Sequence, residues 1–144
     1  MLRGRFGDTS GRPYLEGRLY FPRLEVQCDI SFVVDTGADS TVLMPLDAGK
    51  LGLDYTKLTG GVQTIGVGGL TQMFREPGAV MFLEGTRKLH LYFVDINIAS
   101  PTPDITDVPS LLGRDVLDHW RMHYNPSTGT LTFKVNAADR TLTV

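Results

Sequence analysis

The stretch FVVDTGADSTVL at residues 32–43 carries an aspartate at the end of an apolar run. The residues before Asp35 are typical of a buried strand, where an ionised carboxylate is costly unless it is hydrogen-bonded or paired. Gly37 permits a tight turn that brings backbone N–H groups toward this carboxylate, and the Thr36 hydroxyl can bond to neighbouring backbone. Asp-Thr-Gly can therefore fix a carboxylate for proton transfer, although a solvated Asp turn fits the same residues.

A second stretch, TIGVGGLTQ at residues 64–72, places glycines among strand-forming residues at Gly66, Gly68 and Gly69. A dinucleotide-binding fingerprint needs a glycine where Thr71 stands and a helix after it, so the sequence does not indicate that function. Glycines at a hairpin tip permit close approach to a ligand backbone. The alternative is a plain surface hairpin.

A third stretch, SLLGRDVL at residues 110–117, has the pattern of a buried strand end followed by a turn and a short helix. Gly113 provides the turn, and Arg114 opens the helix. An arginine beside a packed core normally has a carboxylate partner, so we expect one for Arg114. A solvated arginine at the helix start is the alternative.

The elements that position these stretches are mostly strands. Short runs rich in Val, Ile, Leu, Phe, Tyr and Thr are separated by glycines and prolines, which predicts a mostly-β fold over residues 1–144 as a single domain. Helix signals are confined to MPLDAGKLGL, with Pro45 at its start, and GRDVLDHW at 113–120. Pro22 predicts a turn between the first two strands, Gly85 a hairpin turn, and 99–110 a loop. Strands are expected at 14–21, 24–34, 58–65, 70–75, 78–84, 87–98 and 130–135.

Bulk properties exclude several classes of function. The net charge is −2 and the basic residues are scattered, so no nucleic-acid surface is indicated. No apolar run approaches the roughly 20 residues of a membrane span, and the first ten residues lack the apolar core of a signal peptide. The single cysteine, Cys28, excludes an intrachain disulfide, is expected to pack in a strand, and fits a cytoplasmic location.

Taken together, VVDTGADSTVL, IGVGGL and LLGRDVL resemble the retropepsins, the retroviral-type aspartic proteases, and their bacterial relatives. The motifs occur in the family's order, and the resemblance covers roughly residues 14 to 135. It implies a single-lobe, closed acid-protease β-barrel with one or two short helices and an aspartic endopeptidase activity. The segment at 44–62 is longer than in the smallest viral enzymes, and the chain continues beyond the second helix.

The resemblance also implies roles for individual residues. Asp35 would be the catalytic carboxylate, with Thr36 bonding across a dimer axis and Gly37 contacting the substrate backbone. Arg114 would form a structural ion pair with Asp39. Further substrate-binding residues would form the near subsite wall and the tip of a flap: Ala38, Asp39, Ser40, Gly66, Val67 and Gly68.

One aspartate does not suffice for this chemistry. One carboxylate must take a proton from water while a second, protonated one polarises the peptide carbonyl. The near-match GDTSG is rejected as a second motif because Asp8 follows no apolar strand. We therefore expect a homodimer acting on a peptide or unfolded protein, without metal or cofactor. A non-catalytic peptide-binding or dimerisation module with the same fold is the alternative.

The three histidines are the remaining candidates for site residues. His119 and His123 stand four apart, but no further ligand stands at a matching spacing, so no metal site is predicted. His90 alternates with leucines and is expected on a solvated strand face.

Overall fold

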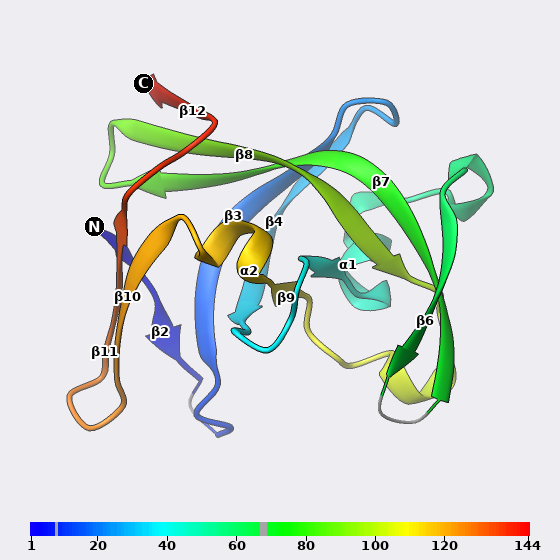
Figure 1. Cartoon of the computed structure of the whole chain (residues 1–144), viewed down its shortest axis with the longest axis horizontal. Helices are drawn as coiled ribbons and strands as arrows, with labels where there is room; N and C mark the ends of the chain where they lie inside the picture. Colours follow the sequence, from blue (N-terminus) through cyan, green and yellow to red (C-terminus); the bar gives the residue numbers. More distant parts are fainter. Residues whose placement is uncertain (8, 67–68) are drawn as a thin grey trace.

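The computed structural model describes residues 1–7, 9–66 and 69–144, with the backbone alone over 62–66 and 69–71. Its body is a closed ring of strands (Figure 1). The ring closes because β7 pairs with both β8 and β3. In ring order the strands are β3 (Pro13–Phe21), β4 (Val26–Val34), β9 (Leu111–Leu112), β5 (Val42–Leu43), β8 (Lys88–Ala99) and β7 (Gly69–Glu84).

Further strands extend this ring or lie beside it. β6 (Gly61–Gly66) pairs with the first part of β7, β12 (Arg140–Thr143) with β8, and β2 (Arg5–Phe6) with β3. A separate sheet has the order β1 (Leu2–Arg3), β11 (Thr130–Val135) and β10 (Trp120–Asn125). Figure 1 shows it beside the barrel, on the side opposite the β6–β7 hairpin.

Helices are few and short in the described part of the chain. α1 (Pro45–Leu51) begins at a proline and ends at Gly52, whose left-handed φ of 66° suits glycine. α2 (Arg114–Leu117) follows Gly113, and short 3-10 turns lie at η1 (Tyr55–Lys57) and η2 (Pro103–Ile105). Neither α-helix has the length and apolar character that crossing a membrane requires.

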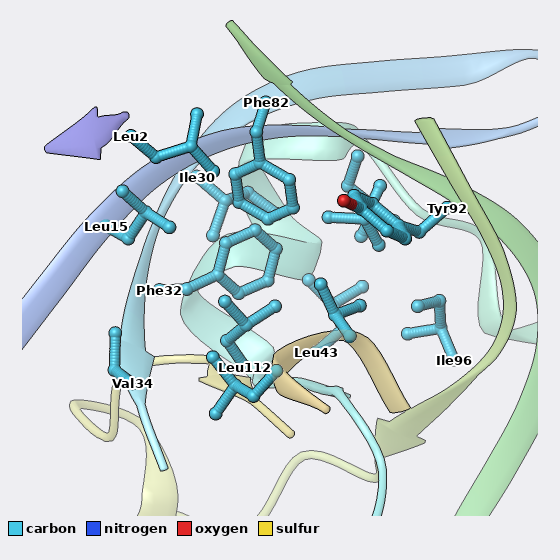
Figure 2. Close-up of a cluster of buried hydrophobic side chains, with 14 of the residues drawn as sticks. Leu2, Leu15, Ile30, Phe32, Val34, Leu43, Phe82, Tyr92, Ile96 and Leu112 are labelled. Atoms are coloured by element: carbon cyan, nitrogen blue, oxygen red, sulfur yellow. The ribbon is translucent and has the colours of Figure 1, made fainter. Parts of the chain in front are cut away.

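The core fills the barrel because alternate residues of its strands point inward. In β4, Ile30, Phe32 and Val34 are buried, while Ser31 and Val33 are only half-buried. Figure 2 shows Phe32 facing Phe82 of β7, with Leu43 and Leu112 from the short central strands beside them. The residues around the end of β4 therefore rest on a packed interior.

Most expected elements are confirmed, including the turn at Pro22 and the hairpin at Gly85. The gap expected between strands 70–75 and 78–84 was wrong, because β7 runs through Pro77 without a break. Residues 76–78 of β7 pair with β8 alone, so the missing N–H of proline is tolerated at a locally open edge. The strands predicted from the sequence did not include β1, β2, β5, β10 or β12.

The expectation for His90 was wrong as well, because its side chain is buried. Its Nδ1 lies 2.8 Å from Thr141 Oγ1, and its Nε2 lies 2.9 Å from Glu84 Oε1. Thr141 belongs to β12, which pairs with the edge of β8 and places Thr141 opposite His90. His90 is buried as Tyr92 is, whereas Leu89 and Leu91 are only half-buried, so the expected inward and outward faces of β8 were reversed here.

Candidate active site

Asp35 stands where two parallel strands end together. Val34 is the last residue of β4 and lies beside Leu112, the last residue of β9. The Asp35 N–H donates to the carbonyl of Leu112 at 3.0 Å, so the residue is held to the end of both strands. The residue is half-buried and directly follows β4.

A tight turn fixes the orientation of this carboxylate. The N–H of Gly37 donates to Asp35 Oδ1 at 2.9 Å, and the N–H of Ala38 donates to the Asp35 carbonyl at 3.1 Å. A Cβ atom on Gly37 would lie 3.2 Å from the same carboxylate oxygen, which is closer than side chains normally approach. Glycine is therefore suited to this position by close approach.

A buried threonine ties the Asp35 turn to the start of α2. The Thr41 N–H and Oγ1 both donate to the Asp115 carboxylate, at 2.9 and 2.8 Å. The Gly113 N–H donates to Thr41 Oγ1 at 3.2 Å. A Cβ atom on Gly113 would lie 2.4 Å from the Ser40 carbonyl carbon, so only glycine fits between the two segments.

Arg114 holds the other side of the turn. Its N–H donates to the Ala38 carbonyl at 2.9 Å, and its Nη1 donates to the Thr36 carbonyl at 2.8 Å. Its Nη2 contacts the Asp39 carboxylate. The two side chains are 42% and 88% exposed, so the pair lies at the surface of the single chain. Breaking this pair in a single chain therefore does not leave a buried charge without a partner.

The carboxylate opens into a pocket of about 340 Å³. Residues of the Asp35 turn form one side of this pocket, and the two other contributing segments are the start of β3 and the strand β10. The lining residues are Pro13, Val34, Asp35, Thr36, Met122 and Tyr124. Met122 and Tyr124 are 38% and 49% exposed, so apolar surface lies directly beside the carboxylate.

The sequence model of the aspartyl protease family matches residues 24–116 of this 144-residue chain. The chain belongs to the aspartyl protease family. The fold of this aspartyl protease is similar to the crystal structure of a retropepsin-like aspartic protease from Rickettsia conorii. The two share 23% identity at a TM-score of 0.61, over 91% of this chain and 95% of the other.

The EIAV protease complexed with the inhibitor HBY-793 is also similar to this aspartyl protease. The identity is 20% and the TM-score 0.53, over 78% of this chain and 90% of the viral one. No curated protein matches the sequence. The retropepsin-like barrel expected from the motifs is thus confirmed.

Several residues that build the protease site were missed in the sequence. Thr41 and Ser110 are fully buried polar residues, each placed just before a two-residue apolar strand. Ser110 Oγ donates to Asp47 at 2.6 Å and accepts from the Met44 N–H at 2.9 Å. A hydroxyl residue next to an apolar pair is the signal that could have found them, but their partners lie more than 60 residues away.

The remaining predicted site residues belong to the Asp35 turn and to the β6–β7 segment. Ala38 and Ser40 are half-buried in the Asp35 turn, next to Asp39. Gly66 ends β6 opposite Gly69. Val67 and Gly68, the expected centre of the flap, lie outside the described residues, as does Asp8.

The described residues that line the pocket beside Asp35 include neither Cys28 nor a histidine, although His123 lies between Met122 and Tyr124 on β10. In the part of the protease that the structure describes, no three His, Cys, Asp or Glu side chains group as metal ligands. Cys28 packs against the core. Its burial raises the pKa of the thiol, which favours the protonated form.

Proposed function

We propose that this aspartyl protease is an endopeptidase in which water is activated between two Asp35 carboxylates, one from each subunit of a homodimer. The observation that carries the proposal is the pocket beside Asp35. Among the described residues, its lining includes one carboxylate, fixed by the Gly37 N–H, and no second acid. Two carboxylates about 3 Å apart share a proton, which supplies both the base and the acid that the reaction needs.

The geometry limits how two chains could meet. A two-fold axis that brings the Asp35 side chains together must pass beside them, so residues lining the same pocket fall into the interface. Met122 and Tyr124 supply exposed apolar surface there. β10 pairs with β11 on one side and, among the described strands, has no neighbour on the other. These features support a symmetric dimer built around β10.

The substrate would be an extended peptide lying between the Asp35 turn and the β6–β7 hairpin. Main-chain hydrogen bonds would hold it, and alternate side chains would enter pockets. In this arrangement Thr36 and Gly37 act with Asp35. One subsite wall would be formed by Ala38, Asp39 and Ser40. The substrate would be contacted on the side opposite Asp35 by Gly66, Val67 and Gly68.

We also infer that residues 1–144 act as one protease domain. The pairing of β1 with β11 and of β12 with β8 supports this, because both ends of the chain join the sheets around the site. A cytoplasmic location stays a prediction from the single cysteine.

The direct test is cleavage of a denatured protein by the purified chain, followed by mass spectrometry across roughly pH 3–7, where carboxylates titrate. We expect wild-type activity that falls as pH rises, because the shared proton is lost and both carboxylates ionise. Asp35→Asn removes the carboxylate and should abolish cleavage. Asp29→Asn is the matched control, because Asp29 lies on β4, the strand that Asp35 follows, and its side chain is 74% exposed. Cleavage by Asp35→Asn would refute the assignment, and an inactive wild type would favour the non-catalytic module.

A further inference from the structure

The β6–β7 hairpin joins the barrel at a base that is distinct from its tip. β6 and β7 pair from Gly66 opposite Gly69 down to Gly61 opposite Phe74. Below that point the Arg75 N–H donates to the Gly60 carbonyl at 2.8 Å, and β7 continues into the barrel. Figure 1 shows the hairpin reaching toward the same edge of the molecule as the end of β4, where Asp35 follows. The orientation of the base therefore determines the direction in which the hairpin points.

One guanidinium group holds both arms of this base. Arg23 Nε and Nη2 donate to the two carboxylate oxygens of Glu76 on β7, at 3.0 and 2.7 Å. The same Nη2 donates to the carbonyl of Lys57, on the arm that leads into β6, at 2.6 Å. Arg23 itself belongs to neither arm, because it lies in the turn between β3 and β4.

The burial of Glu76 makes this ion pair necessary, and the geometry of the guanidinium gives it a direction. Glu76 is 1% exposed, and a buried carboxylate requires a partner. The planar fork of arginine matches both oxygens at once and so fixes direction as well as charge. The turn that carries Arg23 is anchored by Phe21, which is fully buried, and by Leu24, which packs against the core.

We propose that Arg23 is a positioning residue that fixes the β6–β7 hairpin to the barrel in the orientation that receives the substrate. Among the described residues, the side chain of Arg23 bonds to Glu76 and Lys57 and not to the Asp35 turn, so we expect that turn to stay intact without it. The kinetic consequence depends on the proposed peptidase function, whereas the fixation of the hairpin does not. The two parts can therefore fail separately.

The test uses two variants that avoid leaving Glu76 as an unpaired buried charge. Arg23→Lys keeps the charge but loses the fork. The double variant Arg23→Met with Glu76→Leu replaces the pair with apolar side chains and removes the link to Lys57. Arg18→Lys is the matched control, because Arg18 pairs with Asp29 at 3.1 Å on exposed surface and contacts neither arm of the base.

Hydrogen exchange followed by mass spectrometry decides the structural part. In both variants we expect amides of β6 and the first part of β7 to exchange about tenfold faster, with those of β10 and β11 unchanged. Arg18→Lys should match the wild type throughout. Unchanged exchange in the hairpin, or faster exchange spread evenly over the chain, would overturn the proposal.

Peptide cleavage decides the functional part. We expect KM to rise about tenfold in both variants, with a smaller change in kcat, because the hairpin must be ordered at the moment of binding. A looser hairpin with unchanged KM and kcat would overturn the positioning role. A wild type without cleavage activity would refute the proposed function, and the exchange data would still decide whether Arg23 fixes the hairpin.

Discussion

The Asp35 turn and the base of the β6–β7 hairpin are held by arginines that make the same kinds of contact. Arg114 binds the Thr36 carbonyl and the Asp39 carboxylate, while Arg23 binds the Lys57 carbonyl and the Glu76 carboxylate. The arginine side chains are similarly exposed, at 42% and 46%. The two carboxylates, in contrast, differ strongly in exposure.

Asp39 is 88% exposed, whereas Glu76 is 1% exposed. An exposed carboxylate that loses its arginine is solvated by water, but a buried one remains an uncompensated charge. The hairpin base therefore depends on its ion pair. The Asp35 turn has a second support, the hydrogen bonds from the buried Thr41 to the half-buried Asp115.

The largest expected effect is that of Arg23→Ala. It leaves the Glu76 carboxylate buried without a partner, and we expect the free energy of unfolding to fall by about 3 kcal/mol. Urea denaturation followed by tryptophan fluorescence measures this loss. Adding Glu76→Leu to the variant should recover most of the stability, because the buried charge is then absent. A loss below about 1 kcal/mol would show that water reaches Glu76, and the contrast between the two regions would fail.

Burial of this kind marks the limit of what the sequence predicts here. The motif around Asp35 and the motif around Arg114 are each a continuous stretch of sequence. The Asp35 carboxylate, its turn and Arg114 could therefore be predicted from them. The burial of Glu76 could not, because it depends on the packing of a distant turn. Thr41 and Asp115 likewise meet across 74 residues. Local pattern identifies strands and turns, but it does not show which polar residues those strands will enclose.

The second-largest loss of stability is expected when Thr41 no longer supports the Asp35 turn. Thr41→Val keeps the shape but removes the hydroxyl, which leaves Asp115 Oδ1 and the Gly113 N–H without a partner. We expect a loss of about 2 kcal/mol in the free energy of unfolding. Thr41→Ser is the control, because it keeps the hydroxyl and should lose only about 1 kcal/mol from the missing methyl group. Equal losses in thermal or urea denaturation would mean that packing, not hydrogen bonding, stabilises the turn.

The smallest effect is expected for Arg114→Ala in the dilute chain. The exposed pair with Asp39 should contribute less than about 1 kcal/mol, and the loss should shrink further in high salt, since surface pairs are screened. The same measurement at increasing protein concentration sharpens the contrast. If association covers the Asp39 side of the Asp35 turn, the pair loses water and the cost of Arg114→Ala should grow, while the cost of Thr41→Val stays constant. A loss of about 3–5 kcal/mol in the dilute monomer would mean that the pair is shielded within one chain, because only an enclosed pair costs that much to break.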